Sequence, residues 1–159
     1  RLYEIDWIRS EGFAFALEEL MMHAGYLDHR QQRARELVYL QTAWRSCRAI
    51  ADLKLHSNEF TLKDAMEYCV KCAPRGWALE DGPHLWYEMQ TTLRAVGWHM
   101  GMVVGKTQFM KLIRDRAKQL GDEFNLRQFM DEFLASGMIP FSMIRWEMTG
   151  LDNELNKLW

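Results

Sequence analysis

The chain contains little that interrupts a helix and no long apolar run. Three prolines and ten glycines occur among its 159 residues, and β-branched residues are sparse beside Leu, Ala, Met, Glu, Lys and Arg, which all favour helices. This composition argues against a sheet fold. No stretch of 18 or more residues is apolar throughout, so we expect no membrane span. The net charge is −2, with both signs interspersed, which argues against a nucleic-acid partner.

Cysteine is scarce as well. Cys69 and Cys72 form a Cys-x-x-Cys pair, and Cys47 is the only other thiol. A zinc ribbon requires a second such pair, and a thioredoxin-type redox motif requires a βαβ context, and the sequence has neither. We therefore expect no metal or redox role for this pair. The odd number of cysteines favours a reducing compartment, and hence the cytoplasm.

Apolar periodicity and capping residues divide the chain into helices. Asp28 is expected to cap the second helix, and Thr61 with Asp64 forms a variant of the capping box before the third. We predict an all-α multi-helix bundle in one domain over residues 1–159, without a sheet and with at least five helices. The predicted helices are residues 8–24, 28–56, 61–72, 84–96, 100–120 and 125–135, with a short one from residue 140. The apolar face of the second helix is predicted to contain Leu37, Leu40, Trp44, Cys47 and Ala51.

Two carboxylates share one face of the first predicted helix. Glu11 and Glu18 are seven residues apart, which is close to two helical turns. The rest of this helix is largely apolar, and a buried carboxylate must be paired or bound to a metal because its desolvation costs several kcal/mol. The alternative is a solvated acidic stripe that includes Glu19.

A polar stripe on the second predicted helix is the other candidate for chemistry. Arg45, Arg48, Asp52 and His56 are spaced by 3, 4 and 4 residues, so they lie on one face beside the apolar one. A carboxylate next to an imidazole fixes its tautomer and raises its basicity, as in many hydrolytic sites. The alternative is an exposed ladder of ion pairs, in which Arg48 pairs with Asp52.

Several segments resemble one bacterial family, the domain of unknown function 885. Residues 11–18 resemble its Glu-Gly-Trp-Ala-x-Tyr-x-Glu segment, and residues 45–56 are similar to its Arg-Ala-x-Arg-x-Val-x-Asp-x-Gly-x-His. Residues 112–125 resemble its Leu-Arg-x-x-Ala-x-x-x-Leu-Gly-x-x-Phe-Asp, and residues 129–140 its closing Phe-His-x-x-x-Leu-x-x-Gly-x-x-Pro. These blocks occur in the family's order. Its members are helical, zinc-peptidase-like proteins of the gluzincin kind.

The resemblance implies a zinc-dependent hydrolase of metallopeptidase type that acts on a peptide or small molecule. Glu11 would be the third metal ligand, and the substrate cleft would be lined by the polar stripe, namely Arg45, Arg48, Asp52 and His56. A tight turn between the two helices would place Arg45 nearest to Glu11. His56 or an arginine could then donate to the developing oxyanion.

The two zinc-binding histidines that the resemblance implies are absent from this chain. They are expected in a His-Glu-x-x-x-Gly-His-His type segment upstream of residue 11, and none of the five histidines lies in a His-Glu-x-x-His arrangement. We therefore expect the chain to be the C-terminal part of a longer helical metallopeptidase-like domain, or one piece of a split protein. Its partner would be the missing N-terminal part or a companion chain, and alone it would bind zinc weakly or not at all.

The sequence also departs from the family pattern. Phe13 and Ala16 stand where the family has Trp and Tyr, and its Arg-Tyr and Pro-Gly-Gln-Ala segment is degenerate over residues 93–101. His99 in that segment could replace a lost donor or be an ordinary histidine at a helix junction. These departures favour a second interpretation, a non-catalytic helical binding or assembly module that keeps the scaffold without activity.

Overall fold

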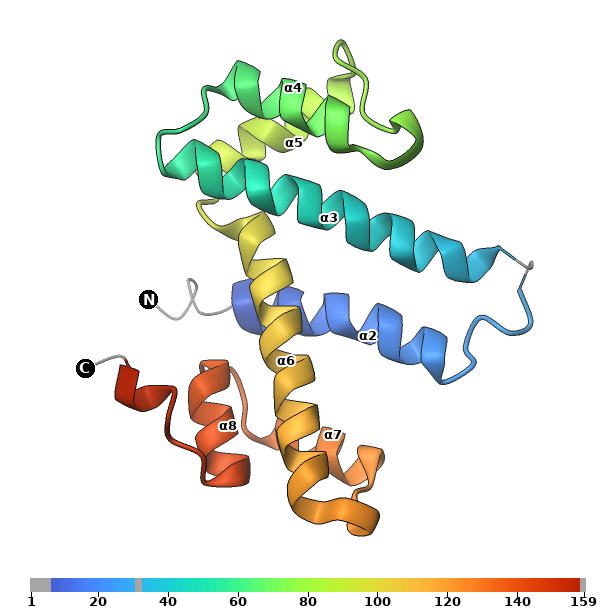
Figure 1. The fold of residues 1–159 in the computed structure, drawn as a ribbon, viewed down its shortest axis with the longest axis vertical. Coiled ribbons are helices and arrows are strands. Elements are labelled where there is room, and N and C mark those ends of the chain that lie inside the picture. Colours follow the sequence, from blue (N-terminus) through green and yellow to red (C-terminus); the bar gives the residue numbers. More distant parts are fainter. Residues whose placement is uncertain (1–6, 31–32, 158–159) are drawn as a thin grey trace. The chain divides into compact units, whose positions relative to one another are not determined.

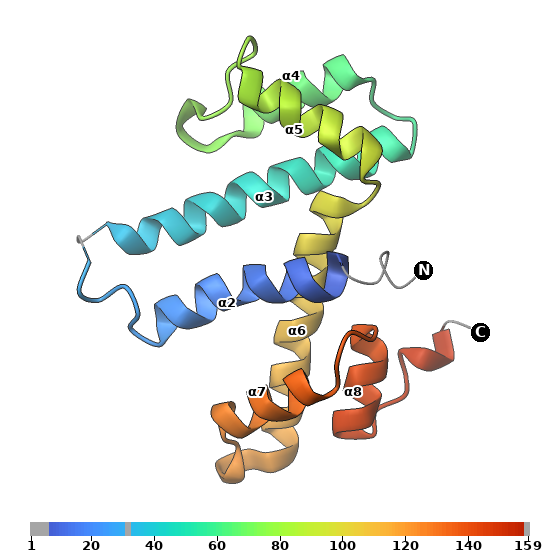
Figure 2. The same cartoon turned by 180° about the vertical axis from the view of Figure 1, so that it is seen from behind.

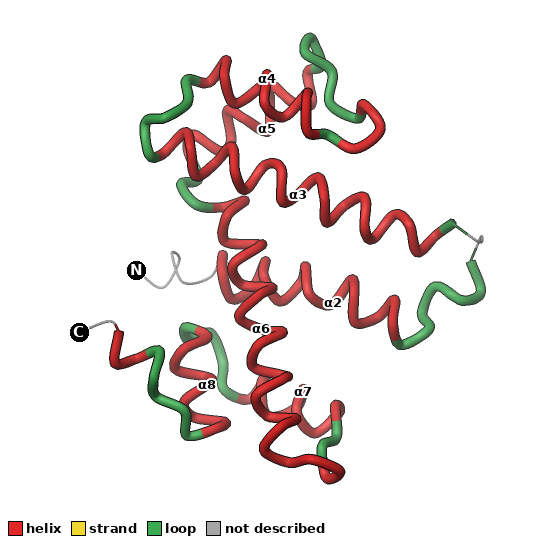
Figure 3. The backbone as a smooth tube through the Cα atoms, viewed as in Figure 1, coloured by secondary structure: helices red, strands yellow, loops and turns green. Residues whose placement is uncertain are grey.

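The computed structural model describes residues 7–30 and 33–157. Within these ranges it contains seven α-helices and no strand, which confirms the all-α prediction (Figures 1 and 3). No helix in the described ranges is both long and apolar enough to cross a membrane. A π-helical turn (Trp7–Glu11) precedes α2 (Gly12–His23), α3 (Ala34–His56), α4 (Leu62–Cys72), α5 (Pro83–Arg94), α6 (Trp98–Leu120), α7 (Leu126–Ala135) and α8 (Phe141–Thr149).

The chain divides into two compact units. Unit 1 consists of residues 1–16 and 104–159, and unit 2 of residues 17–103. The division falls within α2 and within α6, so each of these helices contributes residues to both units. The expectation of one domain that is part of a longer protein stays a prediction.

In unit 2, α4 and α5 pack on the C-terminal half of α3 (Figures 1 and 2). The apolar face of α3 was predicted correctly from Trp44 to Ala51, whereas Leu37 is 54% exposed. Leu37 lies in the first turn of α3, outside the part of the helix that contributes to the buried cluster. The core of unit 2 consists of Trp44, Cys47, Ala51, Leu55, Ala65, Cys69, Ala73, Ala78, Leu85 and Met89.

Two capping predictions had different outcomes. The box before α4 is confirmed, because the Thr61 amide donates to Asp64 Oδ2 at 2.8 Å and the Asp64 amide donates to Thr61 Oγ1 at 3.2 Å. The prediction that Asp28 caps the next helix is wrong, because α3 begins at Ala34. Successive turns after Gly25 delay the start of the helix, and the Asp28 carboxylate instead pairs with Arg35.

In unit 1, aromatic rings form the core between the N-terminal segment, α6, α7 and α8. Phe109 and Phe133 are fully buried, with ring centroids 4.7 Å apart. The buried guanidinium of Arg9 lies 3.8 Å from the centroid of the Phe133 ring, a cation–π contact. A second buried arginine, Arg145, binds Asp115 at 2.8 Å and thereby joins α8 to α6. The pKa of Asp115 is lowered by this partner in spite of burial, which acts to raise it.

Candidate functional site

Glu11 is the last residue of the π-helical turn that precedes α2. π-Helical turns are rare and occur frequently at functional sites. The Glu11 side chain is half-buried, and its carboxylate has no hydrogen-bond or ion-pair partner among residues 7–30 and 33–157. A partly desolvated carboxylate without a protein partner is suited to bind a cation or to accept a hydrogen bond from a bound molecule.

The glycine that follows Glu11 is explained by packing within unit 1. A Cβ atom on Gly12 would overlap the Cα atom of Gly105 on α6, and a Cβ atom on Gly105 would overlap the carbonyl oxygen of Ile8. The two backbones therefore cross in direct contact, which only glycine allows at both positions. This crossing fixes the backbone that carries Glu11.

Arg45 is paired with Glu18 of α2. Its guanidinium donates to both oxygens of Glu18, at 2.6 and 2.7 Å, the bidentate geometry that gives the strongest carboxylate–arginine pairs. Glu18 and Arg45 both belong to unit 2, whereas Glu11 belongs to unit 1. The expectation that Arg45 is the neighbour of Glu11 stays a prediction.

Arg48 is buried and does not form the ion pair with Asp52 that the spacing allowed. Its Nη1 atom pairs with Glu88 of α5, and its guanidinium lies 5.1 Å from the centroid of the Trp44 ring. The Nε atom of Arg48 has no hydrogen-bond partner in the described part of the chain. Arg48 therefore joins α3 to α5 in the interior of unit 2.

Asp52 caps a helix that is distant in sequence. Its side chain is 1% exposed and accepts hydrogen bonds from the amides of Gly97 at 3.2 Å and Met100 at 3.0 Å. Gly97 directly precedes α6 and Met100 lies in its first turn, where the N–H groups have no partner within the helix. The carboxylate also interacts favourably with the positive end of the helix dipole.

His56 lies next to Asp52, as the spacing of four residues predicted. Its Nε2 atom is 3.4 Å from Asp52 Oδ1 and 3.1 Å from the carbonyl oxygen of Thr92 in α5. The side chain is 24% exposed. The four stripe residues of α3 thus contact α2, α5 and the start of α6.

His99 is a buried histidine whose environment the sequence did not reveal. It is 1% exposed, stacks on Trp98, and neither ring nitrogen has a hydrogen-bond partner among the described residues. Burial, with the charge of Arg48, lowers the pKa of His99 to about 3, so the ring is neutral at pH 7. The only signal in the sequence was its position between two glycines at a helix junction.

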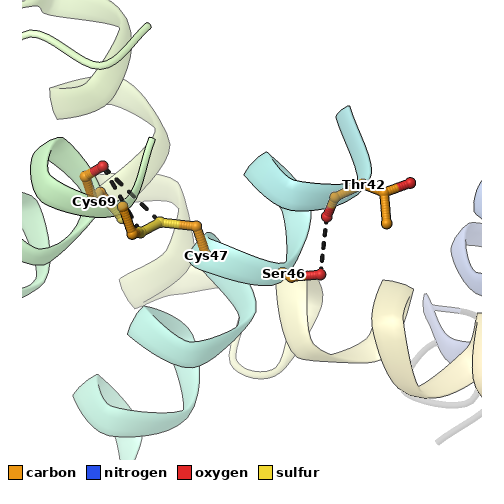
Figure 4. Close-up of a disulfide and its surroundings, with 5 residues drawn as sticks. Thr42, Ser46, Cys47 and Cys69 are labelled. Carbon is orange, nitrogen blue, oxygen red and sulfur yellow. Dashed lines mark hydrogen bonds between the residues drawn. A yellow bond between two sulfur atoms is a disulfide. The ribbon is translucent and has the colours of Figure 1, made fainter. Parts of the chain in front are cut away.

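The three cysteines form one disulfide and leave one free thiol. Cys47 of α3 forms a disulfide with Cys72 at the end of α4, and their Cα atoms are 6.1 Å apart (Figure 4). The carbonyl oxygen of Cys69 lies 3.9 Å from each of the two sulfurs. Cys69 itself is a buried free thiol, and desolvation raises its pKa to about 12. The Cys-x-x-Cys residues therefore do not pair with each other.

The described residues include no group of three or more His, Cys, Asp or Glu side chains arranged to hold a metal. A catalytic zinc site of the two-histidine, one-carboxylate type takes a single glutamate from the protein beside its histidines. Glu11 has the donor chemistry for that one position.

The described residues form an all-α protein in which polar side chains of one long helix, α3, contact α2, α5 and the start of α6. Residues 4–148 match the family described as bacterial protein of unknown function (DUF885), and the chain belongs to this family. No curated protein and no solved structure matches the chain.

Proposed function

We propose that this chain is the C-terminal portion of a zinc-dependent hydrolase of metallopeptidase type. Glu11 is the third protein ligand of the metal, and the substrate cleft is lined by residues of the α3 stripe, namely Arg45, Arg48, Asp52 and His56. The observation that supports this proposal best is the contrast between the two glutamates of the first helical segment. Glu18 is neutralised by Arg45, whereas the half-buried Glu11 has no partner among the described residues.

The chemistry that zinc supplies in such sites is a bound water with a pKa of about 7 and a polarised scissile carbonyl. In this proposal the chain contributes a ligand on a backbone segment that packs directly against α6 at the crossing of Gly12 with Gly105. It also contributes hydrogen-bonding groups on α3 that orient the substrate. Histidines and a general base from the upstream segment complete the site.

The test uses a protein that contains this chain together with the upstream segment. Glu11→Gln is compared with Glu18→Gln, a matched control on the helix that follows directly, which removes a carboxylate already paired with Arg45. Bound zinc is measured by elemental analysis, and turnover on peptide substrates is measured separately. We expect Glu11→Gln to lose zinc and Glu18→Gln to retain it. Full zinc occupancy in Glu11→Gln would overturn the ligand assignment.

The cleft assignment is tested in the same protein with His56→Ala. We expect zinc to stay bound, because His56 is not a ligand in this proposal, while turnover falls. Unchanged turnover would show that His56 has only the structural contacts seen in unit 2.

A second candidate function is a non-catalytic helical binding or assembly module. It is favoured by the observation that all four stripe residues are used in contacts between helices, with Glu18, Glu88, the α6 amides and the Thr92 carbonyl. The two candidates are distinguished by the sequence that precedes residue 1, or that of a companion chain. A His-Glu-x-x-x-Gly-His-His type segment there supports the hydrolase, and its absence from both supports the module.

A further inference from the structure

The junction between α5 and α6 leaves two helix ends side by side in unit 2. The last helical hydrogen bond of α5 runs from the Ala95 amide to the Thr91 carbonyl, so the carbonyl of Thr92 has no helical partner. The chain then turns at Gly97, with φ of +78°, and α6 begins at Trp98. Carbonyl groups at the end of one helix and amide groups at the start of the next both need partners from elsewhere.

Two residues one turn apart on α3 supply those partners. His56 satisfies the Thr92 carbonyl through Nε2, at 3.1 Å. Because a carbonyl oxygen only accepts hydrogen bonds, Nε2 must carry a hydrogen. The neighbouring Asp52 oxygen, 3.4 Å from Nε2, is an acceptor as well. Both neighbours of Nε2 therefore favour the same protonation of this nitrogen.

Asp52 has little freedom to adopt another arrangement. One of its oxygens accepts from the Gly97 amide and the other from the Met100 amide, and the side chain is almost fully buried. The carboxylate is thus held by backbone groups, and it in turn faces the His56 ring. A ring whose Nε2 atom is fixed in this way has a defined orientation and a defined tautomer.

We propose that Asp52 and the Thr92 carbonyl are positioning groups that lock His56 in the Nε2–H tautomer, so that Nδ1 is the atom it offers to a ligand. A neutral ring with hydrogen on Nε2 has a lone pair on Nδ1. The matching ligand group is a hydrogen-bond donor, such as a water, a hydroxyl or an amide N–H. The tautomer does not depend on the proposed hydrolase, whereas the use of Nδ1 to accept a proton or hydrogen bond from substrate rests on that function.

The first experiment reads the tautomer directly in the 159-residue chain. Long-range proton–nitrogen correlation spectra of ¹⁵N-labelled protein are recorded at a pH high enough for the ring to be neutral, and the His56 signals are assigned by their loss in His56→Gln. We expect Nε2 to have the shift of a protonated nitrogen and Nδ1 that of an unprotonated one. A protonated Nδ1, or shifts averaged between the two tautomers, would overturn the inference.

The second experiment compares two isosteric substitutions. The amide nitrogen of Gln reaches roughly as far as Nε2, whereas that of Asn reaches only as far as Nδ1. His56→Gln should therefore keep the bond to the Thr92 carbonyl and unfold at a higher urea concentration than His56→Asn. Equal midpoints would contradict the proposed role of the Thr92 carbonyl.

The third experiment tests Asp52 by Asp52→Asn, which keeps the shape of the side chain. We expect the His56 shifts to move toward the tautomeric average, and unchanged shifts in a folded Asp52→Asn would remove Asp52 from the positioning role. If that variant does not fold, the chemical shifts of His56 in wild type still decide the tautomer.

The activity of the zinc-loaded longer protein separates this inference from the proposed function. If the tautomer is confirmed and His56→Gln loses turnover while zinc is retained, both hold. If the tautomer is confirmed but His56→Gln turns over normally, the locked ring is purely structural and only its catalytic use is lost.

Discussion

The buried ring of His99 should make the stability of this protein depend on pH in a measurable way. Burial lowers the pKa of His99 from 6.5 to about 3 in the folded protein. Between these two values the unfolded chain binds a proton that the folded protein excludes. The free energy of unfolding therefore falls as the pH drops below 6.5, and this contribution levels off only near pH 3.

The magnitude follows from the two pKa values. At pH 7.5 the contribution is close to zero, because the ring is neutral in both states. At pH 5.0 the unfolded chain lies about 1.5 units below its pKa, so the folded protein loses about 2 kcal/mol relative to pH 7.5. This figure requires the folded pKa to lie well below 5, and it is about 3.

The assay is urea unfolding at pH 7.5 and at pH 5.0 for wild type and His99→Phe. Phenylalanine keeps an aromatic ring against Trp98 but does not titrate. The drop in unfolding free energy between the two pH values should be about 2 kcal/mol larger in wild type than in the variant. The reasoning is refuted if both proteins show the same drop. At pH 7.5 the variant should be at least as stable as wild type, because it removes two buried nitrogens without partners.

Three further predictions concern stability. Gly12→Ala should lower the free energy of unfolding by about 1–3 kcal/mol, because the added Cβ would overlap backbone atoms of Gly105. Ala14→Ser, at an exposed position of the same helix, is the control and should change it little. Asp52→Ala should cost about 1–3 kcal/mol by leaving the amides at the start of α6 without acceptors, and Asp52→Asn should cost less; equal losses would contradict the capping role. Reductant should lower the free energy of unfolding by about 3 kcal/mol, since the disulfide closes a loop of 25 residues, and Cys69→Ser should respond to reductant as wild type does.

The parts of the fold that the sequence predicted are those determined by neighbouring residues. The box of Thr61 and Asp64 was recognised because both partners are three residues apart. The same kind of signal was misleading at Asp28, where the turns after Gly25 and a pairing with Arg35 determine the backbone instead. A capping residue predicts the start of a helix only when the helix begins directly after it.

The parts that the sequence did not predict depend on residues far apart in the chain. The spacing on α3 placed Asp52 next to His56 correctly, but it gave no information on the amides of Gly97 and Met100, which are 45 and 48 residues away. The spacing between Cys47 and Cys72 likewise gave no indication that the packing of α3 against α4 would join them. Periodicity in the sequence identifies which residues share a face of a helix, but it does not show which residues elsewhere in the chain that face contacts.

The crossing of Gly12 with Gly105 has a consequence for how members of this family would diverge. If Glu11 binds a metal, as we propose, Glu11 and Gly12 are under different constraints. The glutamate is then required only while a metal is bound, whereas the glycine is required by the backbone contact with Gly105. In a lineage that had abandoned metal chemistry, position 11 would be free to drift. Positions 12 and 105 would stay small together, since enlarging either one alone forces the two backbones apart. Under that proposal, a family member that keeps both glycines but lacks the glutamate would have kept the fold without the metal ligand.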